Sequence, residues 1–206
     1  MKTLTPKAQA TREKIIQAAN NLFYRHGYTA TGLDKIIKAA EVTKGNFYYH
    51  FKSKEELLVA VLDWHRNLAF NELGLNQSLE CKSPIETLLT SIKNIAKRMA
   101  DTPAVQGCES PQVHGCFFGN IALELSTCSE VVRHKVKLIF DDYRGFITEL
   151  LKKAKIANEI DQTLDIQTTA NIIISLMEGA TLLDKAEQKQ SHIYQAIEFI
   201  EMYLKD

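Results

Sequence analysis

The chain is poor in residues that interrupt secondary structure, with nine glycines and four prolines among its 206 residues. Few turns imply few and long elements, which favours helices over a sheet of many strands. Cysteine is also scarce, and Cys81, Cys108, Cys116 and Cys128 show no regular spacing. We therefore expect reduced thiols and no disulfide framework.

Long apolar runs are missing as well. Apolar clusters such as residues 172–174 are far shorter than the roughly 18 residues of a membrane span. The first ten residues are polar, which predicts no targeting segment. Hydrophobic residues make up 45% of the chain and charged residues 24%, the balance of a globular protein that can bury a core. We expect a cytoplasmic protein.

The net charge of zero conceals an uneven distribution. Residues 1–55 contain ten Lys and Arg against four Asp and Glu, a net charge of +6. The remaining residues contain 15 basic and 21 acidic side chains, a net charge of −6. A basic segment on an acidic body is typical of a protein in which only that segment meets a polyanion.

Apolar spacing predicts helices along almost the whole chain. The expected helices cover residues 8–26, 33–40, 44–50, 54–73, 84–99, 115–127, 129–156, 165–186 and 190–204. Gly27 ends the first of them, Thr31 with Asp34 resembles a capping box for the second, and Ser53 is a suitable N-cap for the fourth.

Residues 33–54 carry the pattern that points to function. Two short helices joined by a three-residue turn form a helix-turn-helix, whose second helix enters the major groove of DNA. In that second helix, Gly45 leaves room for the phosphate backbone, and Tyr48 and Tyr49 offer hydroxyls and flat faces. Phe47 and Phe51 are expected in the core instead. The alternative is a generic helical hairpin whose tyrosines merely cover the surface.

The stretch from Thr31 to Leu57 resembles the DNA-binding domain of the TetR family of bacterial regulators, and the match extends over residues 12–58. Two positions depart from the family pattern: Glu41, where the turn often has glycine, and Ile37, where alanine is usual. The resemblance implies an all-α protein. Residues 1–54 are then a three-helix helix-turn-helix DNA-binding domain, and residues 55–206 a helical ligand-binding and dimerisation domain.

Carried over residue by residue, the resemblance implies DNA contacts from Gly32, Leu33, Thr43, Lys44, Gly45, Tyr48, Tyr49, His50 and Lys54. For His50 an alternative stays open, in which the ring braces the helix end and reaches phosphate only indirectly.

Two long helices of the body predict a homodimer, as the resemblance also implies. The helix over residues 129–156 carries an apolar stripe whose members are spaced alternately three and four residues apart, namely Val132, Val136, Ile139, Tyr143, Phe146 and Leu150. The helix over residues 165–186 is apolar on most sides, so its own domain and a second subunit are both expected to cover it. The alternative is that both helices fill one monomeric core.

The resemblance further implies an inducer pocket in the body. Its expected lining is Trp64, Phe70, Met99, Cys116, Phe117, Asn120, Glu124, Phe146 and Met177, although such side chains also serve as plain core. Ligand binding is expected to displace the fourth helix near Trp64 and His65. This displacement would move the two DNA-binding domains of the dimer so that they no longer fit successive major grooves.

Cys116 opens the short central helix, where the helix dipole favours a thiolate. Some TetR-like regulators sense electrophiles through a thiol at a similar point, and the alternative is a small buried apolar residue. Together with Cys108 and His114 it matches no standard metal spacing, so neither a metal nor another cofactor is predicted.

No nucleophile–base pair or carboxylate pair indicates an enzyme, and a structural adaptor does not explain the basic reading helix. The sequence predicts a repressor that binds a palindromic double-stranded operator as a homodimer and is released by a small-molecule inducer. A transcriptional activator and a thiol-based electrophile sensor of the same family are the alternatives.

Overall fold

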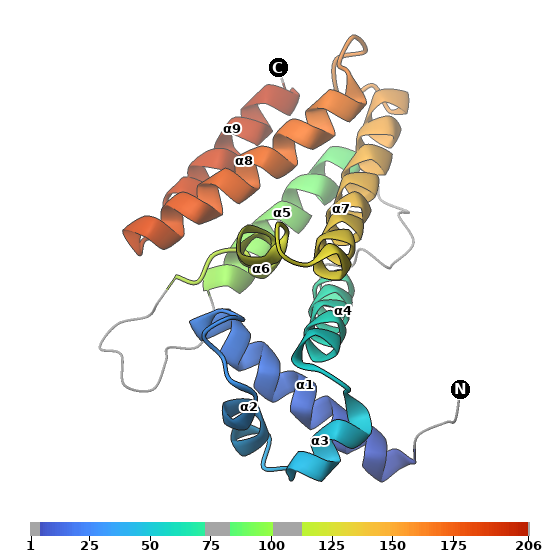
Figure 1. Ribbon diagram of the computed structural model, residues 1–206. Coiled ribbons are helices and arrows are strands. Elements are labelled where there is room, and N and C mark those ends of the chain that lie inside the picture. Colours follow the sequence, from blue (N-terminus) through green and yellow to red (C-terminus); the bar gives the residue numbers. More distant parts are fainter. Residues whose placement is uncertain (1–4, 73–82, 101–112, 206) are drawn as a thin grey trace. The chain divides into compact units, whose positions relative to one another are not determined.

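The computed structural model describes residues 5–72, 83–100 and 113–205, and these contain helices and no strand (Figure 1). The described helices are α1 (Pro6–His26), α2 (Leu33–Ala39), α3 (Lys44–His50), α4 (Lys54–Glu72), α5 (Pro84–Ala100), α6 (Phe117–Leu125), α7 (Glu130–Ile156), α8 (Ile166–Glu187) and α9 (His192–Lys205). The all-α prediction is confirmed, and every predicted helix end lies within two residues of the observed one. None of the described helices is long and apolar enough to cross a membrane.

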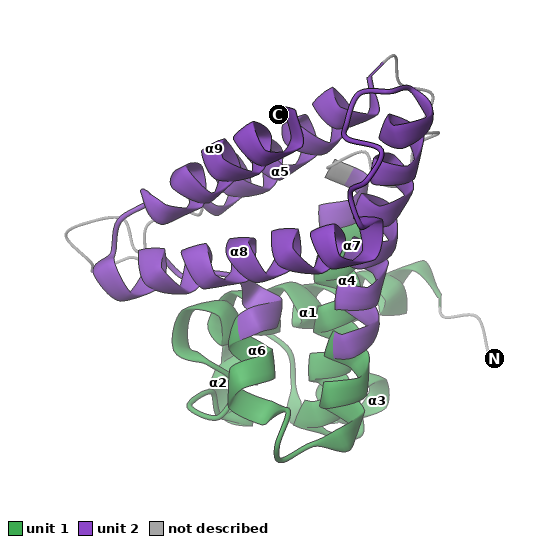
Figure 2. Ribbon diagram, turned by 90° about the horizontal axis from the view of Figure 1, so that it is seen from above, with its two compact units in different colours: residues 1–68, 120–136 green, residues 69–119, 137–206 purple. Residues whose placement is uncertain are grey.

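The chain divides into two compact units (Figure 2). Unit 1 comprises residues 1–68 and 120–136, and unit 2 comprises residues 69–119 and 137–206. Unit 1 therefore holds more than the predicted DNA-binding domain, because most of α4, the end of α6 and the start of α7 belong to it. Helix α6 begins in unit 2 and ends in unit 1. The domain boundary after residue 54 stays a prediction.

Local caps set the helix ends in unit 1. Gly27, with a φ of 80°, ends α1 and donates its N–H to the carbonyl oxygen of Phe23. At the start of α4, the Ser53 hydroxyl accepts the N–H of Glu56 at 3.0 Å, and the Glu56 carboxylate accepts the N–H of Lys52 at 2.7 Å. This reciprocal pair satisfies donors that a helix start leaves open. The cap predicted at Ser53 is confirmed.

The capping box predicted from Thr31 and Asp34 is wrong. Gly32 is the N-cap of α2, and no side chain caps this helix. Thr31 is fully buried, and its hydroxyl donates to the carbonyl oxygen of Gly27 at 2.6 Å. Thr31 therefore ties the loop back to the end of α1 because a buried hydroxyl needs a partner, and it does not start α2.

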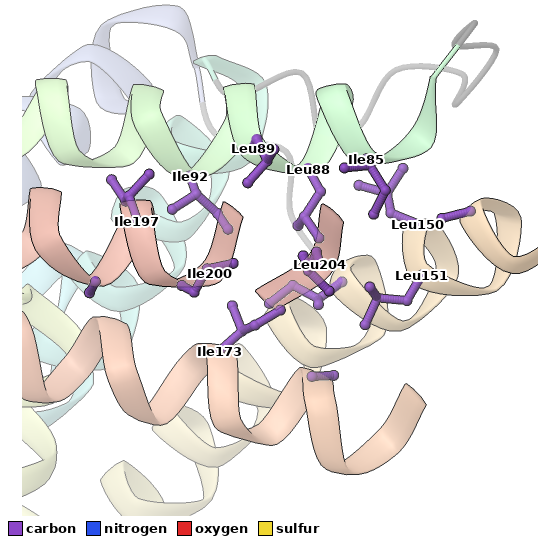
Figure 3. Close-up of a cluster of buried hydrophobic side chains, with 14 of the residues drawn as sticks. Ile85, Leu88, Leu89, Ile92, Leu150, Leu151, Ile173, Ile197, Ile200 and Leu204 are labelled. Carbon is purple, nitrogen blue, oxygen red and sulfur yellow. The ribbon is translucent and has the colours of Figure 1, made fainter. Parts of the chain in front are cut away.

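An apolar cluster from α5, α7, α8 and α9 forms the core of unit 2 (Figure 3). The labelled members are Ile85, Leu88, Leu89, Ile92, Leu150, Leu151, Ile173, Ile197, Ile200 and Leu204. Each such side chain contributes roughly 1.5–3 kcal/mol when it leaves water. The start of α9 is fixed by Asp184, whose buried carboxylate accepts the N–H groups of Ser191, His192 and Ile193.

The stripe on α7 that was expected to form the dimer interface is already buried within one chain. Val132, Val136, Ile139 and Leu150 are at most 3% exposed, whereas Tyr143 and Phe146 are half-buried. For the four buried residues the prediction is wrong, because spacing of this kind also fits a helix that packs on its own chain. Helix α8 matches the expectation better, with one face in the core and an exposed apolar face elsewhere.

Candidate nucleic-acid interface

The core of unit 1 fixes which face of α3 meets solvent. Phe47 and Phe51 are 0% and 1% exposed, as predicted, and their ring centroids lie 5.9 Å apart. A helix turns about 100° per residue, so Gly45 and Tyr49 point away from that core. Tyr48 and Tyr49 are 49% and 71% exposed. Two large aromatic side chains are thus held in water on a rigid helix.

The first turn of α3 joins this outward face. The Thr43 hydroxyl caps the helix by accepting the N–H of Asn46 at 3.2 Å, and Lys44 follows in an exposed position. A Cβ added at Gly45 would meet only the Thr43 hydroxyl oxygen within 4 Å, at 3.9 Å. The surface beside Gly45 is therefore open to close approach by another molecule.

His50 lies at the edge of this face. Its ring packs edge-to-face against Tyr49, with centroids 4.8 Å apart. Burial lowers the pKa of His50, and the nearby positive charge of Arg12 lowers it further. The contact with Tyr49 is compatible with the bracing role, and direct contact of His50 with phosphate stays a prediction.

Lys54 makes contacts inside unit 1. Its ammonium donates to the carbonyl oxygens of Tyr28 at 3.0 Å and Thr31 at 3.1 Å, and it lies 4.0 Å from the centroid of the Tyr28 ring. Burial lowers the pKa of Lys54. Its first role is to brace the loop between α1 and α2, and its predicted DNA contact remains a prediction.

The remaining predicted contacts lie at the start of α2. Gly32 is exposed, and nothing lies within 4 Å of an added Cβ, whereas Leu33 is half-buried. Asn46, which the sequence pattern does not single out, is exposed on α3. Its side-chain amide is of the type that pairs with adenine in the major groove. The position of Asn46 in the second helix of the helix-turn-helix was the sequence signal that could have identified it.

The residues expected to line an inducer pocket are divided between the units. Trp64, Asn120 and Glu124 belong to unit 1, and the others belong to unit 2, namely Phe70, Met99, Cys116, Phe117, Phe146 and Met177. Met99, Phe146 and Met177 pack against the apolar cluster of unit 2. In the same unit, the Phe70 and Phe118 rings lie 5.1 and 6.2 Å from the ring of Tyr143.

Trp64 lines a hollow of about 350 Å³ in unit 1. Its walls come from α1 and α4, and they include Arg12, Glu13, Glu56 and Asp63. Such a charged lining differs from the mainly apolar lining of most small-molecule sites.

Cys116 does not have the surroundings of an activated thiol. Its sulfur accepts the N–H of Gly119 at 3.4 Å. Burial raises the pKa of Cys116 well above its ordinary value, and the neighbouring Glu178 carboxylate raises it further. These effects outweigh the helix dipole that was expected to favour a thiolate. Cys108, the third member of the metal pattern considered above, lies outside the described residues.

Glu124 contacts the loop between α1 and α2. Its two carboxylate oxygens accept the N–H of Tyr28 at 3.0 Å and of Thr29 at 2.6 Å. Burial alone would raise the pKa of Glu124, but the hydrogen bonds from Thr29 and Tyr28 and the charge of Lys54 lower it overall. Both oxygens are engaged within unit 1, and a role in ligand binding stays a prediction.

Comparison with known protein families matches most of the chain. Residues 15–61 match the model of bacterial regulatory proteins of the tetR family, and residues 84–200 match the model of the tetracyclin repressor-like C-terminal domain. The first match covers α2 and α3 together with the turn between them.

Individual relatives agree with the family models. The chain is 34% identical over 178 residues to a helix-turn-helix transcriptional regulator in the lacX 3' region of Lactococcus lactis subsp. lactis, covering 86% of this chain and 85% of the relative. It is 27% identical over 184 residues to the transcriptional repressor DhaR of Mycobacterium sp., covering 89% and 87%. The crystal structure of a TetR transcriptional regulator from Chloroflexus aurantiacus superposes with a TM-score of 0.83 at 27% identity, covering 97% and 96%.

Proposed function

Because this chain belongs to the TetR family of bacterial transcriptional regulators, it is a DNA-binding regulator and not an enzyme, and we propose that it represses transcription from a palindromic operator. It acts as a homodimer in the cytoplasm, and a small molecule that binds the body releases it from DNA.

The outward face of α3 carries this proposal. Tyr48 and Tyr49 stand exposed on a helix whose other side is locked into the core by Phe47, and Lys44 is exposed one turn before Tyr48. Residues 1–55 have a net charge of +6, which attracts DNA of any sequence. Base edges are read by the side chains of α3, so the sequence preference resides there.

The proposed dimer joins through α8 and α9, which pack against each other within one chain (Figure 1). Their exposed large apolar side chains are Ile172, Leu182, Leu183, Tyr194, Phe199, Met202 and Tyr203. Single exposed apolar residues are normal, but a group of them on two adjacent helices favours an interface. A two-fold axis through it relates two α3 helices, as a palindrome requires.

The proposed inducer is small and largely apolar. Unit 2 offers aromatic and methionine side chains for it, among them Phe70, Met99, Phe146 and Met177, with Phe117 and Cys116 at the start of α6. Release requires that the inducer bind one shape of the dimer more tightly than the other. Helix α4 runs from unit 1 into unit 2, so its displacement can move the reading head.

Selection from a random pool of DNA duplexes tests the proposal. The wild-type protein is expected to enrich a palindrome at low salt, and a candidate inducer is expected to release that duplex. If no sequence is enriched, sequence-specific binding is refuted. If the enriched sequence activates a reporter promoter instead of silencing it, repression is refuted.

A further inference from the structure

A carboxylate on α6 holds the loop that leads into the helix-turn-helix. Glu124 lies 95 residues beyond Thr29 in the sequence, yet its two oxygens accept the N–H groups of Tyr28 and Thr29. A carboxylate that accepts two backbone N–H groups makes charge-assisted bonds, which are about twice as strong as neutral ones. All three residues belong to unit 1.

The end of α1 is shaped to admit this carboxylate. Gly27 has a φ of 80°, a backbone conformation that residues with a Cβ rarely adopt. A Cβ at Gly27 would also lie 3.3 Å from Oε2 of Glu124. Glycine is therefore required here for the turn and for the room that the carboxylate occupies.

Lys54 holds the same loop through its carbonyl oxygens. The ammonium donates to Tyr28 and Thr31, so the peptide groups of Tyr28 are bound by a carboxylate at the N–H and by an ammonium at the C=O. The opposite charges of Glu124 and Lys54 also attract each other across the loop. Two charged side chains from distant parts of the sequence thus fix one four-residue segment.

Two further contacts join the start of α7 to α4 within unit 1. The Ser129 hydroxyl donates to the Glu55 carboxylate at 2.7 Å, and Lys135 pairs with Asp63. Specific side-chain contacts therefore hold residues 120–136 to the rest of unit 1. Glu124 is the member of this segment that reaches the loop before α2.

We propose that Glu124 is a positioning residue for DNA binding, which holds the Tyr28–Thr29 segment so that α2 and α3 keep the geometry that fits the major groove. The inference rests on the proposed function. If so, the DNA affinity of the helix-turn-helix depends on a side chain of α6, a helix that begins in unit 2. A movement of α6 along its axis or about it breaks the two bonds without any change in α3 itself.

The expected loss of DNA affinity depends on how often the freed loop leaves the binding geometry. When the loop is freed, only a fraction of the molecules holds α2 and α3 in the geometry that binds DNA, and the apparent affinity falls by that fraction. Loss of one hydrogen bond to a charged group corresponds to roughly tenfold in an equilibrium constant. No phosphate contact is lost, so the salt dependence of binding does not change.

Full-length variants test this inference on the duplex that the wild type selects. Glu124→Ala removes both acceptors, and Glu124→Gln keeps one acceptor oxygen and the shape of the side chain. Glu130→Gln is the matched control, because Glu130 is an exposed acid of the same unit, 3.8 Å from Arg133. Fluorescence anisotropy gives the affinity over a salt series, and hydrogen exchange without DNA follows the amides of Tyr28 and Thr29.

We expect binding up to about a hundredfold weaker for Glu124→Ala, which loses both bonds, about tenfold weaker for Glu124→Gln, which keeps one acceptor, and unchanged for the control, with one common salt slope. The two amides exchange faster in both Glu124 variants. If Glu124→Gln binds DNA with wild-type affinity although the two amides exchange fast, the positioning role is overturned. It is also overturned if the exchange of the two amides does not change in the Glu124 variants. If the wild type itself selects no duplex, the proposed function fails, and this inference falls with it.

Discussion

Lys44 and Asn46 lie two residues apart on α3, and we expect them to contribute to DNA binding in different ways. Both are exposed in the first turn of the helix. Lys44→Ala removes a positive charge and should weaken binding to every duplex, with a salt slope that is smaller by about one. Asn46→Ala removes a base-reading amide and should cost about 1–3 kcal/mol at one base pair, with the slope unchanged.

Salt titrations of both variants on the selected duplex and on a scrambled duplex separate the two roles. If Asn46→Ala weakens both duplexes equally, the side chain does not read a base. If Lys44→Ala leaves the slope unchanged, its ammonium does not neutralise a phosphate.

Glu41 occupies a position that is better suited to glycine. Its φ is 50°, in the left-handed region, and the sequence resemblance already marks glycine as the usual residue of this turn. The side chain pairs with Lys14 at 2.6 Å but is 77% exposed, so this pair adds little to stability. A residue with a Cβ pays about 1–2 kcal/mol in this conformation.

We therefore expect Glu41→Gly to raise the free energy of unfolding by up to about 1 kcal/mol. Glu41→Ala is the control, because it loses the ion pair and keeps the Cβ, and it should lower the free energy slightly. Urea denaturation measures both. An alanine variant as stable as the glycine variant would show that the backbone conformation carries no cost here.

At the scale of elements, α9 is joined to α5 by charged groups as well as by the apolar core. The Glu201 carboxylate accepts from Lys93 on α5 at 2.9 Å and from Lys205 at 2.8 Å. The hydrogen bonds from Lys205 and Lys93 lower the pKa of Glu201 from 4.5 to about 2. A depressed pKa means that the pairing stabilises the fold above pH 4.5 and is lost as the pH falls towards about 2.

The difference in unfolding free energy between the wild type and Glu201→Gln measures this effect. We expect a constant small difference above about pH 5, which shrinks as the pH falls from 4.5 towards 2. Comparing the two proteins at each pH removes the contribution of the other carboxylates. A difference that does not change over this range would contradict the assignment.

Local signals in the sequence locate helices well. Pro84 begins α5, where its missing N–H costs nothing, and Ser53 caps α4 through a neighbour three residues away. Thr31 carries the same local signal as a cap, but burial directs its hydroxyl to α1 instead. The choice between the two depends on packing, which spacing does not contain.

In the candidate site, too, local features could be predicted from the sequence and long-range contacts could not. The outward face of α3 could be predicted because Phe47 and Phe51 mark the buried side within eight residues. The partner of Glu124 could not, because Tyr28 lies 96 residues earlier and no periodicity connects them. The stripe on α7 has the spacing of a packed face, but spacing does not distinguish the chain's own core from that of a second copy.

For the whole molecule, the α8–α9 surface should decide the oligomeric state. Leu183 and Phe199 are 49% and 48% exposed within one chain, so a charge there need not disturb the fold. Leu183→Asp and Phe199→Asp should give folded monomers, because an unpaired charge in a buried interface costs several kcal/mol. Leu123→Asp is the control, since Leu123 is 75% exposed on α6, and it should stay dimeric.

Light scattering at micromolar concentration gives the mass, and circular dichroism shows whether the helices are kept. A wild type that is monomeric at this concentration would refute the dimer. If the two variants remain dimeric and folded, the dimer is formed by another surface.

In the proposed dimer, two α3 helices read the two halves of one palindrome. Hydroxyl-radical footprinting of the wild-type protein on the selected duplex shows whether they do. We expect two protected segments on one face of the DNA, symmetric about the centre of the palindrome and about 34–36 Å apart or a multiple of that distance. A single protected segment, or no protection at low salt, would contradict the claim.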